Sequence, residues 1–127
     1  MTKKLEGAGL RGQVAGETSL STVGQLEGLA YRGHKIETLA EKATFEEVAY
    51  LLLYNKLPNQ SELTEYKALL KDQRDLPDSL KEVLKKIPSN AHPMDVMRTG
   101  TSMLGNLESE GDFSNQLNSI NRMIATM

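Results

Sequence analysis

The chain has 127 residues, of which 39% are hydrophobic and 25% are charged. This balance is typical of a globular domain that can bury a hydrophobic core, and not of a disordered chain. The net charge of −2, from 15 basic and 17 acidic side chains, argues against a broad nucleic-acid-binding surface, which needs clustered basic residues. The lack of cysteine excludes disulfides, thiolate zinc sites and a cysteine nucleophile.

The sequence shows neither a membrane span nor a secretory signal. No apolar run approaches the roughly 18–20 residues that cross a bilayer. Residues 1–7 lack the apolar region of a signal peptide. We therefore expect a cytoplasmic protein that binds neither membranes nor nucleic acids.

Residues 5–40 differ in composition from the rest of the chain. They hold seven of its ten glycines, too many for helices. Two β-prone runs, 18–23 and 29–32, flank a connection at 24–28 and predict a β-hairpin. Such a hairpin is marginal alone, so we expect it to pack on helices.

We divide the chain into an N-terminal flap with a short helix, residues 1–43, and a helical region, residues 44–127. The short helix is expected to begin at Lys35 or Ile36 and to end at Lys42. The helical region is expected to contain about five helices. Together the two regions are predicted to make one partial domain.

The first helix of the helical region begins at a capping box. Thr44 is the N-cap, and Glu47 stands three residues later to bond back to it. Apolar residues lie almost all round this helix, which predicts deep burial. It is expected to end before Pro58, which cannot donate a backbone hydrogen bond.

The next helices are bounded by local signals as well. Asn59 and Glu62 open the second helix, and residues 78–86 form the third, which Pro88 ends. Pro93 suits the first turn of the fourth helix, where its missing N–H costs nothing.

The end of the chain is predicted to be a loop at residues 106–111 and a fifth helix capped by Ser114. The amphipathic spacing of this helix continues to Met127, with no Gly, Asn or Pro stop after it. We therefore expect that the last helix is truncated.

Motifs for metal or nucleotide chemistry are missing from the sequence. The only histidines, His34 and His92, lie far apart and fit no zinc-binding spacing. Residues 7–12 match Gly-x-Gly-x-x-Gly by accident, because the required strand before and long helix after are lacking. We expect neither a metal nor a cofactor.

The two histidines are more readily explained by structure than by chemistry. His92, before Pro93, is expected to enter a helix with its ring bonded locally. The alternative for His92 is a substrate-binding or acid–base histidine. His34 is expected in a turn, with its ring directed outward.

Two arginines are candidates for buried ion pairs or anion ligands. Arg98 lies on the largely apolar fourth helix and must find a partner, because an unpaired buried charge is costly. We expect Glu46 or Glu47 to be that partner. Arg32 is expected to hold the hairpin against the helices.

Three strings of the sequence, in this order, resemble the N-terminal part of the citrate synthase family. They are Tyr31-Arg32-Gly33-His34-Lys35-Ile36, then residues 45–58, then His92-Pro93-Met94-Asp95-Val96-Met97-Arg98-Thr99-Gly100. Residues 12–21 also resemble the N-terminal flap of that family. The continuation after His-Pro-Met is most similar to the 2-methylcitrate synthases within it.

The resemblance implies a mainly α fold: the helical large-domain portion of a citrate synthase-like fold, with a small N-terminal β-hairpin. It implies a homodimeric parent enzyme that condenses an acyl-CoA with oxaloacetate, and propionyl-CoA in propionate catabolism for the 2-methylcitrate synthases. The family uses two histidines and an aspartate for catalysis and arginines for carboxylates. Those residues lie downstream of everything present here, so we assign this chain no catalytic, substrate-binding, cofactor-binding or metal-binding residue.

Two other functions remain open from the sequence. One is a fragment of a plain citrate synthase that uses acetyl-CoA, because the acyl pocket is not in this stretch. The other is a non-catalytic helical interaction module. A fragment should leave the apolar faces of residues 94–104 and 117–127 uncovered and self-associate to hide them, whereas a module should have a closed polar exterior.

Overall fold

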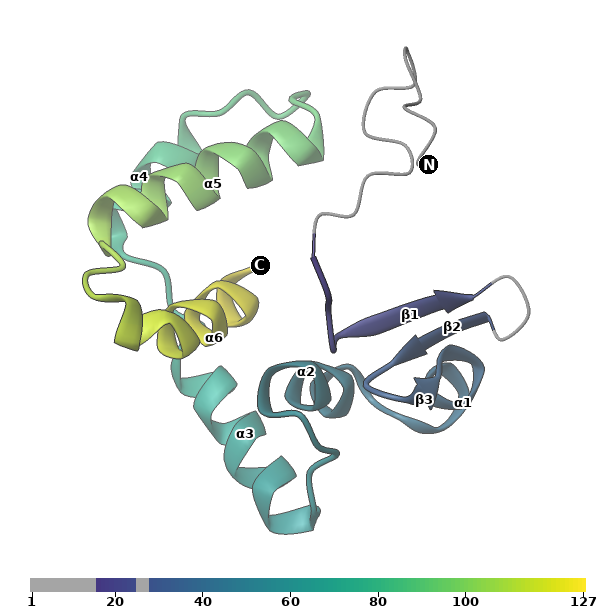
Figure 1. The fold of residues 1–127 in the computed structure, drawn as a ribbon. Coiled ribbons are helices and arrows are strands. Elements are labelled where there is room, and N and C mark those ends of the chain that lie inside the picture. Colours follow the sequence, from purple (N-terminus) through teal and green to yellow (C-terminus); the bar gives the residue numbers. More distant parts are fainter. Residues whose placement is uncertain (1–15, 25–27) are drawn as a thin grey trace, which may run out of the picture. The chain divides into compact units, whose positions relative to one another are not determined.

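The computed structural model of the chain describes residues 16–24 and 28–127 (Figure 1). Within them, six α-helices accompany a three-stranded antiparallel sheet. The mainly helical fold expected from the sequence is therefore confirmed. The chain divides into two compact units, Met1–Lys42 (unit 1) and Ala43–Met127 (unit 2), and each is described by itself.

Unit 1 contains the predicted hairpin. Strands β1 (Ser21–Gly24) and β2 (Gly28–Tyr31) pair antiparallel, with Ser21 opposite Tyr31. The two runs predicted as strands are confirmed: β1 is shorter than the predicted run 18–23, and β2 begins one residue before the predicted run 29–32. Residues 25–27 of the predicted connection lie outside the described residues, as do residues 5–15 of the glycine-rich stretch.

A third strand, β3 (His34–Lys35), was not predicted from the sequence. It pairs antiparallel with β2 through a turn at Arg32 and Gly33, whose φ angles are 48° and 83°. Two positive φ angles suit a tight two-residue hairpin. A strand of two residues is too short to show an alternating pattern, so the sequence carries no signal for it. The predicted short helix follows directly as α1 (Ile36–Lys42).

Unit 2 opens with α2 (Phe45–Tyr54) and the predicted capping box. The Thr44 backbone N–H donates to Glu47 Oε2 at 2.7 Å, and the Glu47 N–H donates to Thr44 Oγ1 at 3.4 Å. The helix ends at Asn55, which has a left-handed φ of 63°. Asparagine is one of the few residues besides glycine that adopts this conformation readily.

The predicted deep burial of α2 is wrong. Only Ala49 and Leu51 of this helix are buried, and Phe45 is 69% exposed. Within unit 2, α2 packs on α3 (Gln60–Asp72), so one face is covered. An apolar sequence shows which faces can be buried, but not how many neighbouring elements are available to cover them.

The second and third predicted helices are confirmed as α3 and α4 (Asp78–Lys85). Asn59 caps α3 through a second capping box: its Oδ1 accepts from the Glu62 N–H at 3.0 Å, and Glu62 Oε2 accepts from the Asn59 N–H at 2.9 Å.

The fourth helix, α5 (Pro93–Leu107), begins at the predicted proline but extends into the predicted loop. Asn106 stays helical, and its side-chain N–H donates to the carbonyl oxygen of Ser102 at 2.9 Å. This back-bond satisfies the amide locally, so the polar side chain does not end the helix.

The fifth predicted helix is present as α6 (Gln116–Thr126), but its predicted cap is wrong. A 3₁₀ turn, Phe113–Asn115, precedes α6 and is capped by Asp112, whose Oδ1 accepts from the Ser114 N–H at 2.8 Å. A carboxylate is as good an N-cap as a hydroxyl, and it stands here two residues before the serine.

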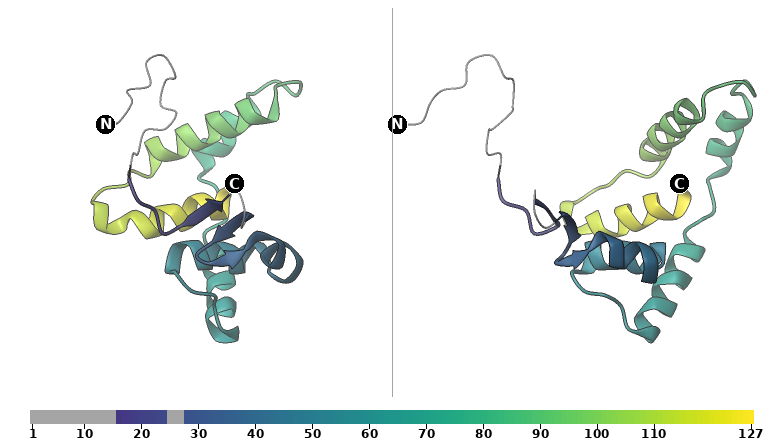
Figure 2. Two further views of the ribbon diagram at one scale, coloured as in Figure 1. Left: turned by 45° about the vertical axis from the view of Figure 1, so that its right-hand side comes forward. Right: turned by 90° about the vertical axis from the view of Figure 1, so that its right-hand side faces the viewer.

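Two helix groups form the packing of unit 2. Helices α4 and α5 lie side by side, and α6 packs on α3 (Figure 2). The buried cluster of Ala49, Tyr66 and Leu70 joins α2 and α3, and Ile124 and Ala125 of α6 pack against it. Within the described residues, no helix is both long and apolar enough to cross a membrane.

Candidate functional site

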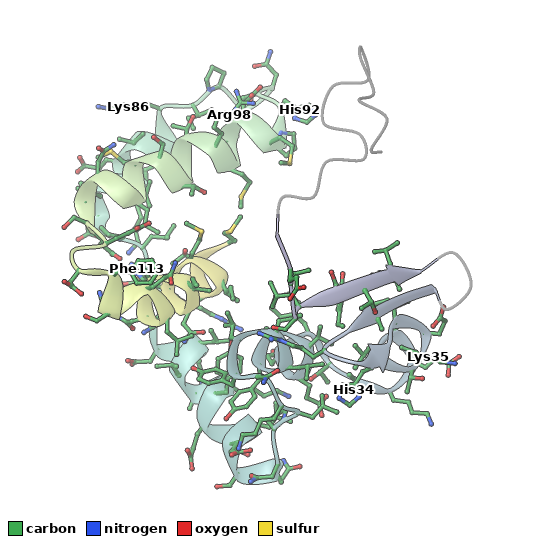
Figure 3. All side chains as sticks on the ribbon, viewed as in Figure 1. His34, Lys35, Lys86, His92, Arg98 and Phe113 are labelled. Atoms are coloured by element: carbon green, nitrogen blue, oxygen red, sulfur yellow. The ribbon has the colours of Figure 1, made fainter. Side chains whose placement is uncertain are left out.

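His92 is the N-cap of α5, as the sequence predicts. Its Nδ1 accepts a hydrogen bond from the Met94 backbone N–H at 3.1 Å, and its side chain is exposed. Figure 3 shows it at the N-terminal end of the helix. This bond occupies the Nδ1 lone pair, and the predicted local bond of the His92 ring at the start of the helix is confirmed.

Arg98 does not make the predicted buried ion pair. Its Nη1 lies 3.2 Å from Asp95 Oδ1 one turn earlier on α5, and its side chain is 80% exposed. The predicted partner Glu47 is instead bonded to Thr44, and the hydrogen bond from the Thr44 backbone lowers the pKa of this carboxyl. An (i, i+3) carboxylate on an exposed face is an easier partner than a distant one.

The candidate side chains of unit 1 lie around the hairpin turn. Arg32 Nη1 donates to Ser19 Oγ at 2.6 Å, and the Arg32 backbone N–H donates to the Leu20 carbonyl at 2.9 Å. Arg32 thus connects the turn to the chain before β1. His34 is exposed and belongs to β3 instead of the predicted turn (Figure 3).

In unit 2, all of which is described, each candidate residue contacts a near neighbour in the sequence: His92 contacts Met94, and Arg98 contacts Asp95. His92 is the only histidine of unit 2. Across residues 16–24 and 28–127, no three side chains of histidine, aspartate or glutamate gather into a possible metal site. His92, Arg98 and Arg32 thus make local contacts, and none of these contacts joins one candidate residue to another.

Arg122 makes a set of contacts in unit 2, here named the Arg122 clamp, that was not predicted from the sequence. Arg122 of α6 donates Nε to Glu108 Oε2 at 2.8 Å and Nη2 to Glu108 Oε1 at 2.6 Å. Its Nη1 donates to the backbone carbonyls of Gln73 and Asp75, the latter at 2.8 Å. Arg122 and Glu108 are 14 residues apart in the sequence, and Glu108 was predicted to lie in a loop. A local sequence pattern therefore does not indicate this ion pair.

Arg122 is partly buried, and Glu108 binds its guanidinium group. The side chain of Arg122 is only 19% exposed, and its bidentate contact with Glu108 is the strong form of an ion pair. The hydrogen bond to Glu108 raises the pKa of Arg122, and the guanidinium lowers the pKa of the Glu108 carboxyl. Its donors are engaged within the protein, so this arginine is poorly suited to hold a substrate carboxylate.

Asn121 lies in a buried hydrogen-bond network with Tyr66 and Tyr54. Asn121, 3% exposed, accepts from the Tyr66 hydroxyl at 3.1 Å and donates to the Tyr54 hydroxyl at 3.2 Å. Burial raises the pKa of Tyr66 to about 12, so the phenol stays neutral at physiological pH. The network joins α2, α3 and α6.

An apolar hollow of unit 2 lies between α4, α5 and α6, and we name it the α4–α6 groove. It has a volume of about 90 Å³. Its lining is made of aliphatic, methionine, glycine and threonine side chains: Leu76, Leu80, Leu84, Val96, Met97, Gly100, Thr101, Leu104, Met123, Thr126 and Met127. No charged side chain lines it, so its lining suits an apolar group.

Comparison with known proteins relates this geometry to an enzyme family. A family model described as the citrate synthase C-terminal domain matches residues 9–127. The chain belongs to the citrate synthase family. It is 63% identical to a 2-methylcitrate synthase of Shewanella oneidensis over 97% of this chain and 33% of that protein.

Solved citrate synthases share the fold of this family member. A citrate synthase from Thermotoga maritima is 37% identical, with a TM-score of 0.80, over 94% of this chain and 31% of that one. A Thermoplasma acidophilum citrate synthase, solved as a ternary complex with carboxymethyl coenzyme A and oxaloacetate, gives a TM-score of 0.82 at 24% identity, over 92% of this chain and 32% of that one. The predicted family and citrate synthase-like fold are both confirmed, and the chain spans about a third of the length of these relatives.

Proposed function

We propose that this chain is the N-terminal, scaffold-forming part of a 2-methylcitrate synthase. The parent enzyme would be an acyltransferase that condenses propionyl-CoA with oxaloacetate to give 2-methylcitrate and CoA. The observation that carries the proposal is the 63% identity to the 2-methylcitrate synthase of Shewanella oneidensis over nearly the whole chain. The parent is proposed to be a cytoplasmic homodimer.

The chain by itself is proposed to be inactive. Condensation of a thioester with a keto acid needs a base for the α-proton, a donor for the enolate oxygen and cations for the carboxylates. In unit 2 the ring nitrogen of His92 that caps α5 is occupied, and Arg98 is bonded to Asp95. Arg122 holds Glu108 and two carbonyls. We therefore place catalysis and substrate binding in the part of the parent outside this chain.

The N-terminal placement is part of the proposal. It rests on the resemblance of three ordered strings, which ends with the string that begins at His92. The matching family model carries the description of a C-terminal domain, yet that model matches this chain from residue 9, across both units. Because this family model matches the flap and the helices together, its description does not conflict with placing the chain in the N-terminal third of the parent.

A plain citrate synthase is the second candidate. It is favoured by the similarity to the Thermotoga maritima citrate synthase, at 37% identity. The two candidates share oxaloacetate and differ in the acyl-CoA. A helical interaction module, the third possibility from the sequence, should have a polar exterior, whereas Met94, Met123 and Met127 are 63%, 43% and 68% exposed.

The test is a fusion of this chain to the part of the Shewanella oneidensis synthase that the chain does not match. CoA release is measured with oxaloacetate and either propionyl-CoA or acetyl-CoA. We expect the fusion to condense propionyl-CoA and the chain alone to release no CoA. Because the acyl pocket lies outside this chain, the acyl preference is measured on the full-length parent: a preference for acetyl-CoA there would replace the proposal by the citrate synthase. A folded fusion that condenses neither thioester would refute the scaffold role.

A further inference from the structure

The first turn of α5 depends on the His92 side chain for one hydrogen bond. Pro93, the first residue of this helix, has no N–H, and the N–H groups of Asp95 and Val96 both donate to the His92 carbonyl, at 2.9 and 3.2 Å. The Met94 N–H donates instead to His92 Nδ1 at 3.1 Å. The imidazole thus satisfies the one N–H among residues 94–96 that the His92 carbonyl does not bond.

This cap depends on the charge of the ring. A neutral imidazole accepts a hydrogen bond at its unprotonated nitrogen, whereas both nitrogens of an imidazolium carry hydrogen and only donate. Histidine ordinarily changes its charge between pH 5 and 8. The caps of α2 and α3, Thr44 and Asn59, have side chains that do not titrate and keep their acceptor oxygens over this interval. In contrast to both of them, the N-cap of α5 can be removed by a proton.

An imidazolium at this position finds little electrostatic compensation on α5. The N-terminus of a helix carries a partial positive charge, so a cation there is unfavourable. Asp95 is the carboxylate of the first turn, and Arg98 Nη1 already lies 3.2 Å from its Oδ1. A charged His92 ring would therefore share the attraction of Asp95 with a second cation.

The C-terminal end of α4 adds positive charge to the same end of the helix pair. Helix α4 packs on α5, with Leu84 against Gly100. Lys85 ends α4, and Lys86 begins the connection that leads back to His92. Figure 3 labels Lys86, Arg98 and His92 on this pair of helices. These cations oppose a charge on the His92 ring, so a new ion pair does not replace the cap that protonation removes.

We propose that His92 is a proton-sensitive N-cap: the neutral ring holds the first turn of α5, and protonation of the ring as pH falls from 8 to 5 releases this turn. Val96 of the turn and Met97 after it line the α4–α6 groove, so release loosens one wall of that hollow. The inference goes beyond the proposed function, because it needs neither an acyl-CoA nor the part of the parent that this chain lacks.

NMR titration of the isotope-labelled 127-residue chain from pH 8 to 5 tests the proposal. The ring proton shifts of His92 report its protonation, and the Cα shifts of residues 94–97 report the helical population of the turn. We expect both to change with the same midpoint, and the ratio of open to closed turn to rise at least about twofold, the effect of losing an N-cap. Cα shifts that stay constant while the ring titrates would overturn the proposal.

His92→Asn is the matched control, because asparagine is among the best N-caps and does not titrate. The turn of this variant should keep one helical population from pH 8 to 5. His34→Asn removes the other histidine, which is also exposed, and should leave the response of residues 94–97 intact. A response that persists in His92→Asn, or that disappears in His34→Asn, would contradict the assignment to His92. If His92→Asn does not fold, the two midpoints of the wild type decide alone.

Discussion

Arg122 joins segments of unit 2 that are distant in the sequence. It links α6 to Glu108 after α5 and to carbonyls of Gln73 and Asp75 after α3. Arg122→Gln should therefore lower the free energy of unfolding by about 1–3 kcal/mol, since it leaves a carboxylate and two carbonyls without their donor. Urea unfolding measures this change.

Arg98→Gln is the matched control for the clamp. Arg98 is 80% exposed and pairs only with a neighbouring carboxylate on its own helix. Its replacement should change stability by less than about 0.5 kcal/mol. Equal losses for the two variants would show that the clamp contributes no more than a surface ion pair.

The clamp should also produce a pH dependence on the acid side. The pKa of Glu108 is lowered in the folded protein by the hydrogen bond from Arg122. Its contribution to stability is therefore complete above the ordinary value of 4.5 and is lost as pH falls through the folded pKa. Glu108→Gln should be less stable than the wild type near neutral pH, and the difference should shrink at lower pH. A constant difference would contradict this.

Tyr66 should produce the opposite dependence on the alkaline side. Burial raises its pKa from 10.0 to about 12. The folded state then favours the neutral phenol, so this contribution is complete below pH 10 and is lost as pH rises towards about 12. Tyr66→Phe should lose about 1 kcal/mol at pH 7, with the hydrogen bond to Asn121, and should depend less on pH above 10.

Tyr50→Phe provides the comparison for this alkaline prediction. Tyr50 packs against the Tyr66 ring, with centroids 5.4 Å apart, but has no part in the Asn121 network. Tyr50→Phe should leave the loss of stability above pH 10 unchanged. If this loss became smaller in Tyr50→Phe but not in Tyr66→Phe, the burial of Tyr66 would not be its cause.

At the scale of secondary structure, side-chain caps mark where α2, α3 and α5 of unit 2 begin. Asn59→Ala removes the side-chain acceptor for the Glu62 N–H and should destabilise the protein by about 0.5–2 kcal/mol. Gln60→Ala, one residue later on the exposed side of α3, should have little effect. Thermal unfolding of the two variants would contradict the capping argument if their midpoints were the same.

The starts of α2, α3 and α5 were predictable because their signals are local. The capping pair of Thr44 and Glu47 and the first-turn Pro93 each act within one turn of the helix, so the sequence alone contains them. The end of α5 was predicted too early, since the back-bond of Asn106 lets a polar residue stay helical. The two-residue strand β3 is too short for any periodic signal.

Side-chain partners were much less predictable. Arg98 was expected to reach α2 but pairs within its own helix, whereas Arg122 reaches Glu108 across 14 residues. Both outcomes depend on which helix faces meet, and periodicity does not contain that information. The predicted local bond of the His92 ring is confirmed, and it was predictable because an N-cap is a local interaction.

At the scale of the whole molecule, family and fold followed from three ordered strings in the sequence. What those strings could not show is which apolar surfaces remain uncovered in a chain that spans about a third of its relatives. The predicted uncovered faces include Met94, Met123 and Met127, which are 63%, 43% and 68% exposed. The α4–α6 groove itself arises only when α4, α5 and α6 are packed together.

We propose that this chain belongs to the scaffold of a 2-methylcitrate synthase and contains none of its catalytic groups. The most direct test is a single-turnover assay of the isolated chain, at an excess over propionyl-CoA and with saturating oxaloacetate. We expect that no CoA is released above the rate measured without protein. Release of CoA with formation of 2-methylcitrate by these 127 residues alone would contradict it.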